Sequence, residues 1–177
     1  PPSIKSILAM KLTEVTYPVL TDSPSGEFPP ETQDVIKHEA QGCNALLLGC
    51  GIGQHPTTAS LVTNLLLSSI PLGAPIVLDA DALNILSSAT NWWEHLTSPT
   101  VITPHPGEMS RLLGCTVQEV EKDRVETARY AANRWAVTVL LKGAFTVIAS
   151  PDGRVRVLPF ANPALATAGT GDVLAGV

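Results

Sequence analysis

The sequence has few of the features that mark disulfide-bonded, membrane-spanning or nucleic-acid-binding proteins. Its 177 residues include only 3 cysteines, which are scattered and lack metal-ligand spacing, so reduced thiols and no protein-bound metal are expected. The formal net charge of −5 gives no electrostatic basis for binding nucleic acid or an anionic membrane. Apolar runs such as residues 137–141 are far shorter than the roughly 20 residues of a membrane span, and no signal peptide is visible. We therefore expect a cytoplasmic protein whose partners include neither nucleic acid nor a membrane.

The hydrophobic pattern predicts an α/β fold. Hydrophobic residues make up 45% of the chain and the mean hydropathy is +0.22, which suits strands buried on both faces. Strands are expected at residues 15–20, 45–48, 75–78, 101–102 and 137–141. Helices are expected at residues 31–41 and 57–70, around Leu83, and at residues 116–134, the last opened by a capping box of Thr116 and Glu119. A polar stretch covers residues 21–30, and a hairpin of residues 145–149 and 155–158 turns at Pro151-Asp152-Gly153. This order predicts a single domain over residues 1–177, with a mostly parallel central sheet, helices on both faces and an antiparallel edge hairpin.

Both ends of the sequence are unusual. The chain opens on Pro1-Pro2 without an initiator methionine and stops at Val177, about one turn into the helix that Asp172 is expected to begin. A helix cut that short cannot cover a sheet. We therefore expect a fragment, with the domain incomplete at both ends.

The most informative segment is the glycine-rich stretch at residues 166–176. Gly169, Thr170 and Gly171 form a loop of small residues that leads into Asp172 and an apolar run, which is how a helix starts. Free N–H groups and the helix dipole at such a start can hold a phosphate or a developing oxyanion. Asp172 beside it could take a proton from a hydroxyl that is being phosphorylated. The alternative is an ordinary helix cap in which Asp172 only stabilises the dipole.

Each of four expected strands runs into a cluster of glycines or polar residues. In open α/β sheets the ligand lies outside the carboxyl ends of the strands, so these clusters should converge on one crevice with the glycine-rich loop. The four clusters are residues 49–53, 79–84, 103–108 and 142–143.

The first two clusters each have a structural alternative. Gly51 and Gly53 either make a tight turn or let the backbone approach a ligand. Asp81 is expected to cap the helix that contains Leu83, whereas Asp79 at the strand end could touch a metal or a ligand hydroxyl.

The other two clusters carry the charged candidates. His105 is held rigidly between two prolines and is expected to be exposed, which favours a ligand role. Glu108 and Arg111 could instead be ordinary helix residues, one favoured by the dipole and the other solvated. Lys142 could equally be a surface lysine at a strand end.

These segments together resemble one known family. VLDADALN (residues 77–84), TPHPGEMSRLLG (103–114), LLKGAFTVIASPDG (140–153) and NPALATAGTGDVLAG (162–176) are similar, in this order and spacing, to the NAD(P)H-hydrate dehydratases. That family belongs to the ribokinase-like superfamily and repairs hydrated nicotinamide cofactors. The resemblance covers nearly the whole chain, although the GTGD segment alone would fit ribokinase-like kinases in general.

The resemblance implies an enzyme, a carbon–oxygen lyase that uses ADP or ATP with Mg²⁺ to turn hydrated NADH or NADPH back into NAD(P)H. Asp172 would be the catalytic base. The implied anion hole and nucleotide site comprises Lys142, Gly143, Thr146, Gly169, Thr170 and Gly171. The implied hydrate site comprises Gly51, Gly53, His105, Glu108, Arg111 and Asp172. We also expect a homo-oligomer.

One position departs from the family pattern, and two other functions stay open. The family usually has Gly-Pro-Gly where this chain has Gly49-Cys50-Gly51, which keeps the glycines and loses the stiff proline. A ribokinase-like kinase for a vitamin precursor would keep the loop and Asp172 but release a phosphorylated product; the cluster at residues 105–108 argues against it. A non-catalytic nucleotide-binding module would have no need of a base at position 172.

Overall fold

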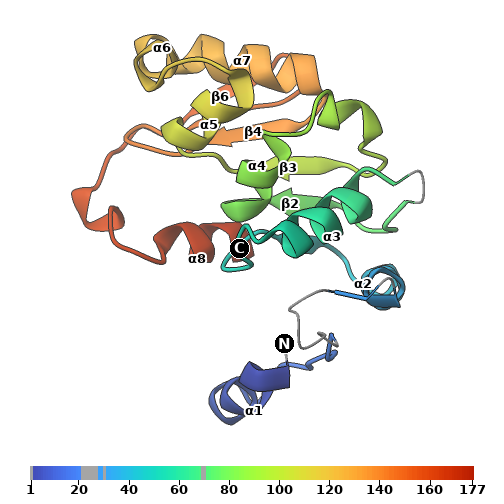
Figure 1. Cartoon of the computed structure of the whole chain (residues 1–177). Coiled ribbons are helices and arrows are strands. Elements are labelled where there is room, and N and C mark those ends of the chain that lie inside the picture. The colour runs from blue at the N-terminus through green and yellow to red at the C-terminus, as the bar shows by residue number, and fades with distance from the viewer. Residues whose placement is uncertain (1, 21–27, 30, 69–70) are drawn as a thin grey trace.

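The computed structural model describes residues 2–20, 28–29, 31–68 and 71–177, without the side chains of residues 2–4 (Figure 1). Its strands are β1 (Leu46–Leu48), β2 (Ile76–Leu78), β3 (Thr100–Ile102), β4 (Thr138–Leu141), β5 (Val147–Ala149) and β6 (Val155–Val157). Its α-helices are α1 (Pro2–Lys11), α2 (Glu31–Gln41), α3 (Pro56–Leu66), α4 (Asp81–Leu86), α5 (Pro106–Leu113), α6 (Val117–Lys122), α7 (Arg124–Trp135) and α8 (Thr170–Gly176). Two 3₁₀ turns, η1 (Trp92–His95) and η2 (Pro163–Leu165), complete the described elements. No helix of the described residues is long and apolar enough to cross a membrane.

The six strands form one sheet in the order β1-β2-β3-β4-β5-β6. Strands β1 to β4 are parallel, and β4, β5 and β6 are antiparallel neighbours, which confirms the expected mixed sheet with an edge hairpin. Leu48 pairs with Leu78, and Leu78 with Ile102, so these three strands end in line. The loops that follow them therefore meet at one edge of the sheet.

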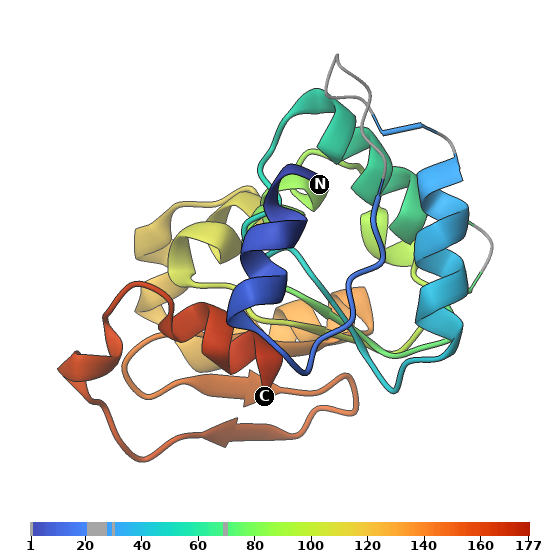
Figure 2. The same ribbon diagram turned by 90° about the horizontal axis from the view of Figure 1, so that it is seen from below.

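The core lies between one face of the sheet and the crossover helices. Leu78, Ile102 and Leu141 are fully buried there, together with Met109 of α5 and Trp135 of α7. The strand residues between them, such as Leu140, face the other side and are less buried. Leu140 lines a cavity together with residues of α8, so helices lie on both sides of the sheet. In Figure 2, seen from below, α8 is projected over the side of the sheet that carries β5 and β6, and Figure 1 shows that α8 is separated from those strands.

Several expected elements have different limits in the structure. Residues 15–20 are not a strand: Pro18 lacks the N–H that a sheet ladder uses, and Val15 and Val19 are exposed without a partner strand. Figure 1 shows α1, just before this segment, well away from the sheet. The expected strand at residues 45–48 is present as β1, but at the sheet edge Leu47 is 39% exposed rather than buried.

Two expected helices also change. The helix expected at residues 57–70 ends at Leu66, and residues 69–70 lie outside the described residues, as do residues 21–27 and 30 of the expected polar stretch. The helix expected at residues 116–134 begins with its capping box, but it is two helices. Asp123 has non-helical backbone angles (φ −149°, ψ 87°) between them and caps α7 by accepting a hydrogen bond from Glu126 N at 2.9 Å.

Candidate functional site

A cluster of buried charges lies where β2, β3 and β4 end. Asp79 follows β2 directly and is 1% exposed, while Glu108 of α5 is 4% exposed. The ammonium of Lys142, at the end of β4, donates to Asp79 Oδ1 at 2.7 Å and lies 3.8 Å from Glu108 Oε2. Two carboxylates and one ammonium thus share a site that is largely closed to water, where an unpaired charge would be costly.

The glycine-rich loop lies next to this cluster. A Cβ added to Gly171 would be 3.6 Å from Lys142 Nζ and 4.0 Å from Asp79 Oδ2, so the start of α8 faces the buried charges. Helix α8 begins at Thr170, with Gly169 as its N-cap at φ +89°. The N–H of Thr170 donates to Thr167 O at 3.3 Å, and its hydroxyl to Leu165 O at 2.7 Å. The N–H groups of Gly169, Thr170 and Gly171 are expected to face an anion. That of Thr170 is instead already hydrogen-bonded within the loop.

Asp172 contacts the position at which the chain departs from the family pattern. The Cys50 thiol is hydrogen-bonded to the Asp172 carboxylate. Partial burial, that hydrogen bond, and the negative charges of Asp79 and Asp172 raise the pKa of Cys50 to about 11, against an opposing effect of Lys142. The loop after β1 thus meets the charged cluster and the start of α8. No local pattern connects Cys50 with Asp172, because the two residues lie far apart in the chain.

The glycine turn after β1 is tied to the loop after β2. Gly51 and Gly53 have φ values of +69° and +73°, so a turn accounts for both glycines, and the space in front of each is open. Asp81 accepts hydrogen bonds from Gly53 N at 2.9 Å and from Gln54 Nε2 at 2.8 Å. The expectation that Asp81 caps α4 is wrong, because Ala80 is the N-cap and the carboxylate is used across the loops instead.

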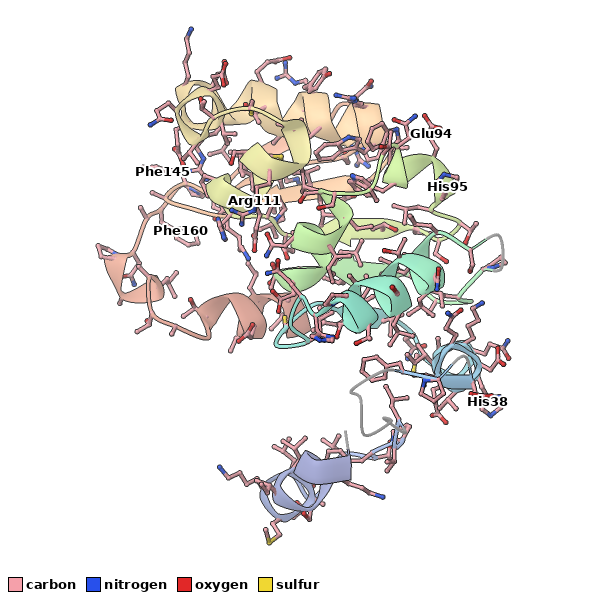
Figure 3. The ribbon with its side chains drawn as sticks, in the orientation of Figure 1. His38, Glu94, His95, Arg111, Phe145 and Phe160 are labelled. Carbon is pink, nitrogen blue, oxygen red and sulfur yellow. The ribbon has the colours of Figure 1, made fainter. Side chains whose placement is uncertain are left out.

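His105 and Glu108 form a capping box at the start of α5. His105 Nδ1 accepts from Gly107 N at 3.0 Å, and Glu108 Oε2 accepts from His105 N at 2.7 Å. The imidazole is half-exposed, as expected, and its Nε2 lies 3.4 Å from Glu108 Oε1. Farther along α5, Arg111 is exposed and its Nε donates to Asn84 Oδ1 at 2.9 Å. In Figure 3, Arg111 lies between the helices near the middle of the molecule, whereas His38 and His95 lie at its outer parts.

A cavity of about 720 Å³ opens on the other side of Lys142. Gly143 and Thr146, in the turn between β4 and β5, line it together with Thr170 and Gly171. The Thr146 hydroxyl donates to Gly143 O at 2.9 Å and closes that turn. The rest of the lining is mainly apolar and includes Phe160, Leu165, Val173 and Leu174. The volume is that of a small-molecule site with a few polar groups at one end.

The structure therefore brings the expected clusters into one site with two sides. Lys142, Gly143, Thr146, Thr170 and Gly171 line the cavity. Asp172 follows Gly171 directly, is exposed, and interacts with Cys50. The turn at Gly51 and Gly53, with His105 and Arg111, belongs to the loops after β1, β2 and β3. From the sequence, Asp79 is expected only as a contact for a metal or ligand. Its ion pair with Lys142 joins residues 63 positions apart and therefore leaves no local pattern.

Comparison with known proteins gives consistent results. The model of the NAD(P)H-hydrate dehydratase family matches residues 5–177. The chain is 43% identical over 177 residues to the bifunctional NAD(P)H-hydrate repair enzyme Nnr of Moorella thermoacetica, covering 100% of this chain and 33% of that protein. A crystal structure of the ADP/ATP-dependent NAD(P)H-hydrate dehydratase from Bacillus subtilis, co-crystallised with ATP/Mg²⁺, has a TM-score of 0.71 at 31% identity. The match covers 98% of this chain and 56% of that one.

A ribokinase-like superfamily protein from Enterococcus faecalis has a TM-score of 0.67 at 25% identity. That match covers 82% of this chain and 49% of the Enterococcus protein. The fold is thus ribokinase-like, and the chain spans about a third of the length of the Moorella relative.

Proposed function

Because the chain belongs to the NAD(P)H-hydrate dehydratase family, we propose that the protein dehydrates hydrated NADH or NADPH at the expense of ADP or ATP. The observation that carries the proposal is that the Lys142 ammonium lies beside Gly171 at the start of α8, where both residues line a large, mainly apolar cavity and Asp172 follows directly in the chain. A carboxylate, an ammonium and a helix start at one point suit phosphoryl transfer to a hydroxyl. A site built only for nucleotide binding would not need Asp172.

In the proposed reaction the nucleotide lies in the cavity of about 720 Å³, with its phosphates along Lys142, Gly143 and Thr146. The ring hydroxyl of the hydrate attacks the terminal phosphorus and Asp172 accepts the hydroxyl proton. The bond from that phosphorus to the bridging oxygen breaks, and AMP leaves from ADP or ADP from ATP. The N–H groups at the start of α8 stabilise the charge on the transferred group; each such donor is typically worth about 3–4 kcal/mol in a transition state. The phosphate then leaves as the ring nitrogen shares its lone pair, and loss of a proton from the next ring carbon restores the double bond.

The hydrate occupies the other side of Asp172 in this proposal. The space in front of Gly51 and Gly53 is open, and Gly51 directly follows Cys50, which interacts with Asp172. Half-exposed His105 and exposed Arg111 supply hydrogen-bonding groups for a dinucleotide. Glu108 is buried and positions His105 by accepting a hydrogen bond from its backbone N–H, so in this proposal it acts on the hydrate through His105.

Mg²⁺ fits this site without a protein cage. The described residues contain no cluster of three or more His, Cys, Asp and Glu side chains that could hold a metal. Mg²⁺ bound to nucleotide phosphates needs only one or two carboxylates, often through water. Asp79 and Glu108 already bind the Lys142 ammonium, and Glu108 also binds the backbone of His105. The ion would therefore be held by the nucleotide phosphates and water, and it would neutralise charge on the phosphates.

The proposal also keeps three expectations from the sequence: one domain over residues 1–177, a homo-oligomer, and work in the cytoplasm without nucleic acid or membrane. The hydrophobic core formed by residues 62–149 supports one domain, and the net charge of −5 is unfavourable for binding nucleic acid or an anionic membrane.

The deciding experiment incubates the full-length protein with NADH hydrate, Mg²⁺ and ADP or ATP. Absorbance of the reduced nicotinamide should return together with release of inorganic phosphate. Accumulation of a phosphorylated hydrate without recovered absorbance would assign a kinase instead. Nucleotide binding with neither product would leave only the binding module.

A further inference from the structure

Arg124, the first residue of α7, binds the backbone that carries the nucleotide-side residues. Its Nη1 donates to Ala144 O at 2.7 Å. Its Nη2 donates to Leu141 O at 3.1 Å and to Lys142 O at 3.0 Å. One guanidinium thus holds three carbonyls of the turn between β4 and β5, in the fork geometry that only arginine offers.

This arrangement works against the local preferences of the helix. The start of a helix favours acidic side chains and disfavours a cation, because the dipole is positive there. Arg124 Nε is also buried and finds no acceptor among the described residues. Three bonds from a charged donor offset these costs, since such bonds are stronger than neutral ones. Arg124 is thus present despite an unfavourable position at the helix start and a buried Nε without an acceptor in the described part of the chain, which indicates that its hold on the turn matters for function.

Gly143 shows how closely the guanidinium follows the turn. Its φ is +147°, and a Cβ there would lie 2.6 Å from both Nη1 and Nη2 of Arg124. Arg124 therefore packs directly beneath the backbone of Gly143, whereas the other side of Gly143 faces the cavity. Arg124 is not among the cavity-lining residues, so it acts on a ligand only through the turn.

We propose that Arg124 is a positioning residue for the nucleotide site: it holds the turn of residues 141–144 so that Lys142 and Gly143 are presented to the phosphates. The identity of the ligand rests on the proposed function, but the hold on the turn does not. Loss of Arg124 should weaken nucleotide binding and leave the hydrate side of the site intact. The conservative change to lysine should fail, because an ammonium lacks the planar fork.

The test compares Arg124→Ala and Arg124→Lys with Arg129→Ala in the full-length protein. Arg129 lies on the same helix, is half-exposed and pairs only with Glu126 at 2.7 Å, so its removal controls for the loss of charge. We expect both Arg124 variants to raise the KM for ADP by about tenfold or more. The kcat at saturating ADP and the KM for the hydrate should change little. Added guanidinium at low, non-denaturing concentration should restore ADP affinity to Arg124→Ala. Arg129→Ala should match wild type.

Amide hydrogen exchange gives a second measurement that needs no ligand. The N–H of Lys142 donates to Pro104 O and the N–H of Leu158 donates to Thr146 O, so these two amides report on the turn. Their exchange should accelerate in Arg124→Ala relative to Arg129→Ala, while β1 and β2 stay protected. The proposal would be overturned if Arg124→Ala lowered kcat and raised the KM for ADP and the KM for the hydrate to the same extent, without rescue by guanidinium. Unchanged amide exchange at the turn in Arg124→Ala would overturn it as well. If the wild-type protein bound neither ADP nor ATP, the proposed function would be contradicted instead, and the exchange experiment would still decide the role of Arg124.

Discussion

Lys142 Nζ lies 2.7 Å from Asp79 Oδ1, although the two residues are 63 positions apart in the chain. They meet because β2 and β4 end at the same edge of the sheet, with β3 between them. The side chain of Asp79 is 2% exposed and that of Lys142 is 19% exposed, so solvent screens the pair only weakly. The pair fixes the ammonium beneath Gly171, at the start of α8.

Breaking this pair should destabilise the fold. We expect Asp79→Asn to lower the free energy of unfolding by about 2–3 kcal/mol, because Lys142 keeps only the more distant Glu108 as a partner. Urea unfolding of Asp79→Asn, Lys142→Met and the double variant gives the coupling energy. Additive effects of the two single changes would show that the pair contributes nothing to stability.

Alanine substitutions at Gly169 and Gly171 should impair different properties of the protein. Gly169 has φ +89° and open space around it, so Gly169→Ala should cost stability, by about 1–2 kcal/mol, through backbone strain. Gly171 has ordinary backbone angles, and a Cβ there meets Lys142 Nζ at 3.6 Å, so Gly171→Ala should fold normally. It should nevertheless weaken ADP binding by about tenfold, since the methyl group would occupy the phosphate side of the loop. Thermal unfolding and calorimetry separate the two effects; normal ADP affinity in Gly171→Ala would reduce the loop to a helix cap.

Asp172→Asn should abolish turnover while nucleotide binding survives. The amide keeps the shape and the contact with Cys50 but cannot accept the hydroxyl proton. Asp34→Asn, at an exposed position of α2, is the matched control and should be fully active. Turnover by Asp172→Asn within about tenfold of wild type would remove Asp172 from the role of base.

The sheet was predictable from the sequence because its signals are local. Buried apolar runs, the turn at Pro151-Asp152-Gly153 and the capping box at Thr116 each determine structure within a few residues. The break at Asp123 was missed because the helical periodicity continues through it. The false strand at residues 15–20 has the right composition, but a strand also needs a partner, which no local pattern supplies.

The site was predictable as a meeting of loops and not as a set of contacts. Parallel strands bring their carboxyl ends together, so the clusters had to converge. Which carboxylate binds which cation depends on side-chain directions, and Asp81 and Arg124 show the limit. Asp81 was expected to cap a helix, but it binds the loop after β1. Arg124 has no signal in the sequence, yet it donates hydrogen bonds to three carbonyls.

Cys50 should react slowly with alkylating reagents until the solution is strongly basic. Its pKa rises from 9.0 to about 11, so at pH 8 about one thiol in a thousand is the reactive thiolate. Because the folded pKa is raised, the thiol favours the fold below about pH 9 and loses that contribution as the pH rises through 11. Peptide mass spectrometry after iodoacetamide treatment should show exposed Cys43 labelled first at pH 8, with labelling of Cys50 becoming appreciable only at higher pH. Alkylation of Cys50 should then stop turnover, because the adduct lies against Asp172. Equal labelling of both cysteines at pH 8 would contradict the contact.

ADP should support faster hydrate dehydration than ATP at equal concentration. The terminal phosphate must reach Asp172 and the start of α8 with either donor, so adenosine lies one phosphate closer to Lys142 in ADP. The donor is thus chosen by the depth of the cavity beyond Lys142 and Thr146. The form of residues 103–108, with His105 where eukaryotic relatives of the family tend to carry asparagine, resembles the bacterial branch, which tends to use ADP. Side-by-side kinetics with purified nucleotides measure the preference, with phosphate release as the common readout. A kcat/KM for ATP about tenfold above that for ADP would reverse the assignment of the donor and leave the repair of the hydrate in place.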